Sequence, residues 1–439
     1  MIRIILFTLM IGSTIQKAFP QTFDKARLDN YFNALEANNK FMGSVAISQN
    51  GQIIYTKQIG YADIDNKIKP DDNTKYRIGS ISKTFTTVLI FKAIDQGKLK
   101  LTDKIDIQFP AIKNANRITI SDLLYHRSGI RNFTANADYL RWNTEKKSEE
   151  EMIEIISKGG SDFEPGTKAE YSNSNFVLLS YFLQRIYKKD YAQLLNEQII
   201  KPTGLKNTHF GRKADIKDND CYSYSFKGNW VKEPETDLSI AMGAGAIVST
   251  PGDLTKFADA LFNGKLVSPG DLKLMETLKD NYGMGLFKIP FYDKSGYGHN
   301  GGIDGFTSVM YHFADSNVSI AMTSNGTNFD NNQISIALLS AVYNKSYEIP
   351  TFKTFEVTGV DLDKYLGVYS SKQMPLKITI TRNGKTLIAQ ATGQPSFALE
   401  ATEKDKFKFD PAKVVLEFNP TDESMILKQG GGTFNFSKE

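Results

Sequence analysis

The chain has very little of what disulfide frameworks and metal clusters require. Its 439 residues contain one cysteine, Cys221, and four histidines, at positions 126, 209, 299 and 312. A lone cysteine cannot form an intramolecular disulfide, and the histidines follow no metal-ligand spacing. The sequence therefore predicts no metal and no cofactor, and we expect Cys221 to be a structural residue.

Blocks of like charge and long apolar runs are missing as well. The 53 basic and 49 acidic residues are interspersed and leave a formal net charge of +4, which does not favour a nucleic-acid partner. After the N-terminal segment no apolar stretch approaches the roughly 18 residues of a membrane helix, so we expect no membrane span. A hydrophobic content of 41% with 23% charged residues is typical of packed domains.

The N-terminal segment has the pattern of a secretory signal. In "MIRIILFTLMIGSTIQKAFPQTF" one positive residue, Arg3, precedes an apolar run of about eight to twelve residues, and small and polar residues follow. We therefore predict a signal peptide over residues 1–21 and a periplasmic or secreted bacterial protein.

Residues 22–345 are predicted to form one α/β domain. Two alternating, β-branched runs on either side of Asn50-Gly51 predict a hairpin, a helix is expected over 76–97, and residues 100–280 are mostly helical in pattern. Strand patterns then return. We expect an antiparallel sheet made of both ends of this domain and covered by helices, with a helical subdomain inserted and the site at their junction.

The composition changes after residue 345. The stretch "YEIPTFKTFEV" predicts a linker over residues 346–355. Beyond it, about eight short strand-like runs alternate with turn residues such as Asn383-Gly384. This pattern predicts a small antiparallel β domain, a barrel or half-barrel, over residues 356–439.

Residues that can carry chemistry first appear in "YRIGSISKTFTT", residues 76–87. On a helix, positions i and i+3 share a face, so the Ser80 hydroxyl and the Lys83 amine can come within hydrogen-bond reach. Burial can push a lysine toward neutrality, and a neutral amine can take the proton of a serine nucleophile. Alone, this tetrapeptide favours an ordinary capped helix start, and Ser82 is predicted to be structural.

A second motif lies in "EYSNSNF". Tyr171 can act as base and later as acid if a neighbouring cationic lysine lowers its pKa. Asn173 offers an amide that can hold a substrate carbonyl and also anchor Lys83. By itself the segment is typical of a turn-rich loop before a helix.

A third motif, "YGHNGGIDGF", begins at Tyr297 and contains His299-Asn300-Gly301 on a predicted strand. Glycines weaken a strand unless something must approach its backbone closely, and a substrate along that edge would be such a thing. The N–H groups of Gly302 and of Ser80 would then form an oxyanion hole. A glycine-rich bulge with a structural histidine is the alternative, and Tyr297 and Asp304 are weaker candidates for the cleft.

Taken together and in this order, the three motifs resemble those of the serine β-lactamase and penicillin-binding protein superfamily, in particular its class C β-lactamase and DD-peptidase branch. The segments "LLYHRSGI", "FEPGTKAEYSNSNF" and "GAGAIVSTPGDLTKFADAL" are similar to further parts of that branch. The resemblance covers about residues 25–345, and the C-terminal segment looks like the small lipocalin-like β domain of some relatives.

The resemblance implies a role for each motif residue. Ser80 would be the acylated nucleophile, Lys83 its proton partner, and Tyr171 the general base and acid. Asn173 would orient the substrate amide. His299 stands where many β-lactamases carry the lysine of K-T-G, and a histidine is only partly charged near neutral pH. This difference favours peptides or esters over β-lactams.

The strand motif completes the implied site. Asn300, Gly301 and Gly302 would line the substrate, with Asn300 at the position where threonine is usual. His126, in the "HRSG" turn, is predicted to bond backbone.

The function implied is that of a secreted serine hydrolase acting through an acyl-serine intermediate on D-amino-acid-containing peptides of the cell envelope, as a DD-carboxypeptidase or D-aminopeptidase. A class C-like β-lactamase and a carboxylesterase are alternatives within the enzyme class. A penicillin-binding or wall-binding protein without turnover is a third.

Overall fold

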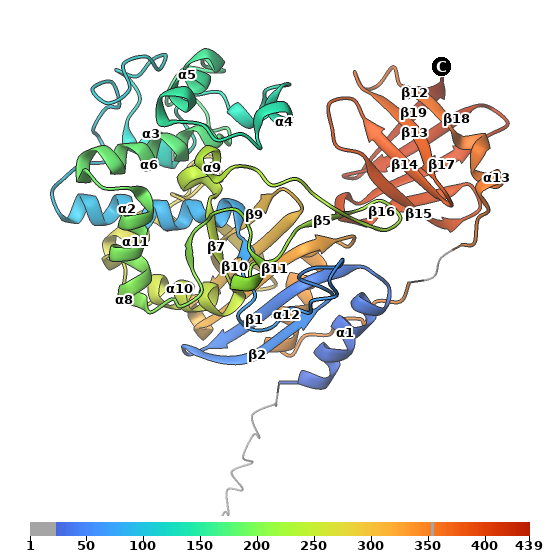
Figure 1. The fold of residues 1–439 in the computed structure, drawn as a ribbon, viewed down its shortest axis with the longest axis horizontal. Helices are drawn as coiled ribbons and strands as arrows, with labels where there is room; N and C mark the ends of the chain where they lie inside the picture. Colours follow the sequence, from blue (N-terminus) through green and yellow to red (C-terminus); the bar gives the residue numbers. More distant parts are fainter. Residues whose placement is uncertain (1–22, 353–354) are drawn as a thin grey trace, which may run out of the picture.

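The computed structural model describes residues 23–352 and 355–439. The predicted signal peptide, residues 1–21, lies outside the described residues, as do residues 353–354 of the predicted linker. Figure 1 shows an α/β body with a C-terminal β barrel beside it. The predicted fold class, an antiparallel sheet between helices followed by a small β barrel, is confirmed.

The body is built on a six-stranded antiparallel sheet that joins both ends of the domain. The hairpin at Asn50-Gly51 is confirmed, and both of its turn residues have positive φ. In sheet order the strands are β2 (Gln52–Ile59), β1 (Phe41–Gln49), β11 (Val318–Thr327), β10 (Phe306–Phe313), β9 (Lys294–Ile303) and β8 (Phe287–Phe291).

Helices cover both faces of this sheet because successive strand residues point to opposite sides. On β10, Val309 packs toward α1 (Lys25–Ala37) and α12 (Asn331–Val342). Its neighbour Met310 packs toward α2 (Ser82–Asp95) and α10 (Pro251–Phe262). The larger of the two apolar clusters therefore lies on the side of the sheet that carries α2.

The remaining elements of the body belong mostly to the inserted helical region. The helices are α3 (Ile120–Leu124), α4 (Tyr139–Trp142), α5 (Glu149–Gly159), α6 (Asn173–Tyr187), α7 (Tyr191–Leu195), α8 (Lys201–Thr203), α9 (Leu238–Gly245) and α11 (Pro269–Glu276). The short strands are β3 (Tyr76–Arg77), β4 (His209–Phe210), β5 (Tyr224–Phe226), β6 (Trp230–Lys232) and β7 (Ile247–Ser249). Strands β5 and β6 form a hairpin, and β3, β7 and β4 form a small sheet.

The start of α2 differs from its prediction. A helix was expected from residue 76, but Tyr76 and Arg77 pair with β7 as β3, and a 3-10 turn, η1 (Gly79–Ile81), precedes the helix. Gly79 has φ +49°, and a side chain there would collide with the backbone of Gly302. The bend presses the turn that carries Ser80 against β9.

The C-terminal segment is a closed eight-stranded antiparallel barrel, preceded by the short helix α13 (Gly359–Leu362). Alternate strand residues fill its interior with aliphatic and aromatic side chains. Its strands are β12 (Gly367–Ser370), β13 (Lys377–Asn383), β14 (Thr386–Ala391), β15 (Phe397–Glu403), β16 (Lys406–Phe409), β17 (Val414–Asn419), β18 (Ser424–Gln429) and β19 (Gly432–Lys438).

Candidate active site

The first two predicted residues are in contact. Ser80 lies in η1 and Lys83 in the first turn of α2, and Nζ of Lys83 is 2.9 Å from Oγ of Ser80. The same amine is 2.8 Å from Oδ1 of Asn173 and 2.7 Å from the carbonyl oxygen of Ala244. Lys83 therefore joins η1, α6 and α9 at a single nitrogen.

Burial decides the charge of Lys83. The side chain is fully buried, and this holds the pKa of Lys83 well below its ordinary value. A neutral amine has two N–H groups, which suit the carbonyl oxygens of Asn173 and Ala244, and one lone pair, which is left for Ser80. The lone pair of a neutral amine can accept the proton of a serine hydroxyl, which a serine nucleophile requires.

Tyr171 is present at the site but differs electrostatically from its prediction. Its ring centroid lies 4.9 Å from Nζ of Lys83. Burial raises the pKa of the Tyr171 phenol, and its interaction with Ser80 lowers that pKa only in part. The predicted lowering by a cationic lysine is wrong, because burial of the phenol outweighs the interactions that lower its pKa. Burial therefore favours the protonated phenol at Tyr171.

His126 supports the segment that carries Tyr171. As predicted, it bonds backbone: its Nδ1 accepts a hydrogen bond from the N–H of Ser172 at 3.1 Å. Its ring also packs on the Tyr171 ring, with 4.5 Å between centroids. Burial lowers the pKa of His126 well below its ordinary value, so the imidazole stays neutral and keeps the acceptor that this bond needs.

The amide of Asn173 is held at both ends. Its oxygen bonds Lys83, as predicted, while its Nδ2 lies 3.3 Å from Oδ1 of Asn132 and 3.2 Å from Oγ1 of Thr134. Both N–H groups of this amide thus have a protein partner. Sequence reasoning missed Asn132 and Thr134. They lie in a segment without any motif, and only the fold brings them to Asn173.

The strand β9 directs His299 and Asn300 to opposite faces of the sheet. His299 is buried beside Phe287, its Nδ1 bonds the carbonyl oxygen of Asn300, and burial lowers the pKa of His299 to about 3. The expected partial charge near neutral pH is therefore wrong, and the imidazole is neutral. The side chain of Asn300 accepts a hydrogen bond from the hydroxyl of Tyr311, on the face away from Lys83.

Gly301 and Gly302 lie where β9 packs against η1. Pairing of β9 with β8 ends at Gly298, while its pairing with β10 continues. A side chain at Gly301 would collide with the carbonyl oxygen of Ile78, and the backbone nitrogen of Gly302 adjoins Gly79. Beyond its pairing with β8, the edge of β9 therefore runs directly past η1, at a separation that requires glycine at positions 79 and 301.

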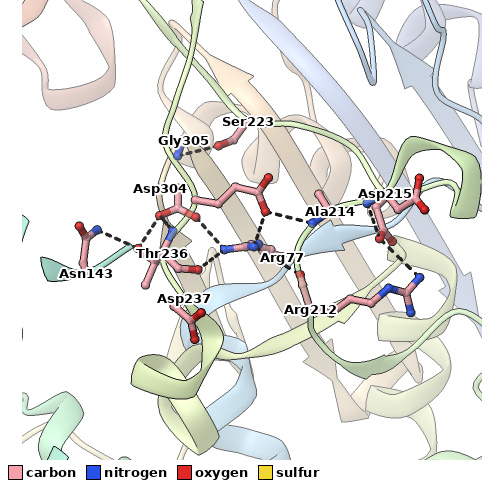
Figure 2. Close-up of polar contacts among 12 residues, drawn as sticks. Arg77, Asn143, Arg212, Ala214, Asp215, Ser223, Thr236, Asp237, Asp304 and Gly305 are labelled. Carbon is pink, nitrogen blue, oxygen red and sulfur yellow. Dashed lines mark hydrogen bonds and ion pairs between the residues drawn. The ribbon is translucent and has the colours of Figure 1, made fainter. Parts of the chain in front are cut away.

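An ion-pair network that sequence reasoning missed ties these segments together (Figure 2). The buried guanidinium of Arg77, three residues before Ser80, lies 3.1 Å from Asp304 and 2.6 Å from Glu235. Asp304 accepts hydrogen bonds from the N–H of Thr236 at 3.0 Å and from its hydroxyl at 2.6 Å. Two carboxylates around one guanidinium give this part of the site a net negative charge.

A cavity of about 670 Å³ opens beside Ser80. Its walls come from the inserted helical region, from the β5–β6 hairpin and the segment after it, from the β9–β10 turn, and from the barrel. Asp304 lines it, as do Lys227, Glu233 and Ser396, whereas Tyr297 does not. The weaker candidate Asp304 is thus at the cleft.

The other predicted residues lie apart from this site. Cys221 is buried, its thiol contacts the carbonyl oxygen of Lys75, and burial raises the pKa of that thiol. Ser82 is structural, since its hydroxyl accepts a hydrogen bond from the N–H of Ile247. Residues 23–352 and 355–439 contain no group of three or more His, Cys, Asp or Glu placed to hold a metal ion. In the same residues, no helix has the length and apolar character that a membrane crossing requires.

Comparison with known proteins agrees with this geometry. The Beta-lactamase family model matches residues 28–343. A teichoic acid D-alanine hydrolase of Staphylococcus aureus is 28% identical over 309 residues, covering 69% of this chain and 74% of that protein. A penicillin-binding protein of Bacillus subtilis is 24% identical over 443 residues, covering 93% and 97%.

Among solved structures, a D-amino acid amidase of Ochrobactrum anthropi in complex with D-phenylalanine is similar to this chain. It superposes with a TM-score of 0.64 at 26% sequence identity, and the match covers 72% of this chain and 99% of the amidase. The similarity thus spans almost the whole amidase and leaves part of this chain unmatched.

Proposed function

Because this chain belongs to the Beta-lactamase family, we propose that it is a secreted hydrolase that removes the acyl group of a D-amino acid from an amide or ester through an acyl-Ser80 intermediate. The class of serine hydrolase itself follows from the family and from the similarity to a D-amino acid amidase and a D-alanine hydrolase. The substrate, the residue roles and the secretion are the proposal.

Acylation would use Lys83 as base and Tyr171 as acid. Oγ of Ser80 attacks the substrate carbonyl carbon while its proton passes to the neutral Lys83 amine. The N–H groups of Ser80 and Gly302 stabilise the oxyanion. The bond to the leaving nitrogen or oxygen then breaks as Tyr171 gives that atom a proton, and the proton on Lys83 passes to the phenolate.

Deacylation would return the site to its starting state. A water molecule attacks the ester carbonyl and gives a proton to Lys83, and the ester bond to Oγ of Ser80 then breaks as Lys83 gives that oxygen the proton. The raised pKa of Tyr171 keeps the phenol protonated between turnovers. Lys83 is therefore a better base for this water than Tyr171.

The neutral, buried His299 is the observation that carries the substrate class. DD-carboxypeptidase and β-lactam substrates bear a carboxylate, and a neutral imidazole supplies no charge to attract it. Among the charged residues that line the cavity, Asp304 and Glu233 are acidic and Lys227 is basic, and this balance favours an ammonium group. A free amine next to the scissile carbonyl defines aminoacyl amides and aminoacyl esters, the chemistry named in the two relatives.

A substrate panel tests the proposal. Four compounds would be compared: a D-alanine anilide or amide, a diacyl D-Ala-D-Ala peptide, a chromogenic cephalosporin and a simple nitrophenyl ester. We expect the D-alanine amide to have the highest kcat/KM and Ser80→Ala to abolish its hydrolysis. Preference for the D-Ala-D-Ala peptide or the cephalosporin would overturn the substrate class. Hydrolysis of the simple ester alone would favour a carboxylesterase, and a single burst without turnover would favour a penicillin-binding protein.

A further inference from the structure

We propose that the C-terminal barrel forms the end wall of the acyl side of the catalytic cleft and so limits the length of the acyl group that Ser80 accepts. The turn between β14 and β15, residues 392–396, carries Pro395 and Ser396, and both line the same cavity as Ser80. The barrel thus contributes to the site although the family match ends at residue 343.

The barrel is joined to the body by two ion pairs from residues that follow this turn. The buried Lys40, just before β1, forms an ion pair with Glu400 of β15. Lys413, before β17, lies 3.3 Å from Asp330, just before α12. A buried ion pair holds its two partners in one geometry, since separating them leaves an unpaired charge.

The hairpin β5–β6 links the barrel to the cleft wall, because it contacts the barrel and also lines the cavity. In Figure 1 this hairpin extends from the body toward the barrel. Its tip residue Gly228 lies so close to Thr386 of β14 that a side chain at Gly228 would collide with the threonine hydroxyl. Next to it, the carbonyl oxygen of Lys227 accepts a hydrogen bond from Asn383 at 3.4 Å, and Lys227 itself lines the cavity.

The assignment to the acyl side rests on the proposed function. Tyr171 would give its proton to the leaving group, so the leaving group must lie on the Tyr171 side of Ser80. Neither Tyr171 nor His299 lines the cavity, which instead runs past Gly302 to the barrel. The acyl group is therefore the part of the substrate that points toward Ser396.

The test varies acyl length at a constant leaving group. One series is the p-nitroanilides of D-alanine and of glycyl-glycyl-D-alanine, and a second is the p-nitrophenyl esters of acetate, butyrate and octanoate. We expect wild-type kcat/KM to fall at least tenfold from the shortest to the longest member. Ser396→Trp should lower kcat/KM for D-alanine anilide and butyrate at least tenfold and leave acetate within twofold. A Pro395→Gly, Ser396→Gly double variant should recover at least threefold on the long members.

A matched control separates the wall from general damage to the barrel. Thr421→Trp places the same side chain in the exposed turn between β17 and β18, which does not line the cavity, and it should match wild type on every compound. Equal kcat/KM across acyl lengths in wild type, or a Ser396→Trp profile equal to that of Thr421→Trp, would overturn the proposal. If the ester series behaves as expected but the anilides do not, the proposed D-aminoacyl substrate is wrong. The proposal that the barrel limits the length of the acyl group is then supported.

Discussion

Arg77 and Asp304 are 227 residues apart in the chain, yet they form a 3.1 Å ion pair in which neither side chain is more than 4% exposed. Arg77 belongs to the strand that leads into Ser80, and Asp304 belongs to the turn that follows Gly302. The pair therefore connects the nucleophile to the strand that would form the oxyanion hole.

Replacing Asp304 by asparagine should damage both stability and activity. The neutral amide keeps acceptors for Thr236 but leaves a buried guanidinium with one carboxylate in place of two, and breaking a buried pair costs about 3 kcal/mol. Loss of register between η1 and β9 should lower kcat/KM at least tenfold. Urea unfolding and steady-state kinetics measure the two effects.

The control for Asp304→Asn is Asp218→Asn, which removes an exposed ion pair to Arg212. Exposed pairs contribute roughly 0–1 kcal/mol, so this variant should behave as wild type. Equal kinetics for Asp304→Asn and wild type would show that Arg77 and Asp304 do not position the site.

The next prediction separates the two proton-transfer residues. Tyr171→Phe removes the acid, so an anilide, whose leaving nitrogen needs a proton, should lose about 100-fold or more in kcat/KM. A p-nitrophenyl ester should lose far less, because p-nitrophenolate leaves without protonation. Tyr282→Phe is the matched control, since its ring centroid lies 6.5 Å from that of Tyr171. Equal losses on both substrates would rule out an acid role for Tyr171.

The sequence predicts contacts between residues that are close in the chain better than contacts between distant segments. The contact of Ser80 with Lys83 follows from helical spacing alone, and the Asn50-Gly51 hairpin follows from turn chemistry. The carbonyl of Ala244 beside Lys83 has no sequence signal, because any backbone could fill that place. It became visible only with the packing of α9 on α2 and α6.

The wrong predictions of charge at Tyr171 and His299 also arise because segments far apart in the chain create the burial. A tyrosine near a lysine predicts a lowered phenol pKa only if the lysine is charged, and the charge of Lys83 depends on a burial that many segments create together. His299 was expected to be partly charged for the same reason. Its burial beside Phe287 of β8 and Tyr171 cannot be read from a single strand.

The burial of His299 should make the protein sensitive to acid. The folded-state pKa of about 3 lies below the unfolded value of 6.5, so between these pH values the unfolded chain binds the extra proton. Stability therefore falls as pH drops from 6.5 toward 3, by about 1.4 kcal/mol per pH unit for one such site. His299→Gln should reduce this slope by about that amount, measured by urea unfolding between pH 6.5 and 4.5. An unchanged slope would contradict a neutral, buried imidazole.

Placing a cation at residue 299 should change substrate preference. His299→Arg adds a charge that burial does not remove, because a guanidinium stays protonated in proteins, and this charge attracts carboxylates. We expect the ratio of kcat/KM for the D-Ala-D-Ala peptide over D-alanine anilide to rise at least tenfold. His299→Gln, which adds no charge, is the control and should leave the ratio within threefold. A ratio that rises equally in both variants would mean that charge at residue 299 does not select the substrate.

The last prediction concerns two adjacent glycines. Replacement by alanine should lower stability at Gly301 and slow the labelling of Ser80 at Gly302. A methyl group at Gly301 would collide with the carbonyl oxygen of Ile78, so Gly301→Ala should lose about 1–3 kcal/mol of stability from overpacking. At Gly302 the nearest atom to such a methyl group, the carbonyl oxygen of Phe306, is 4.0 Å away, so Gly302→Ala should fold normally. The methyl group would nevertheless stand beside the substrate path along β9, and labelling of Ser80 by a fluorophosphonate should slow at least tenfold. Thermal unfolding and labelling rates distinguish the two variants, and fast labelling of a stable Gly302→Ala protein would mean that substrate does not pass along this edge.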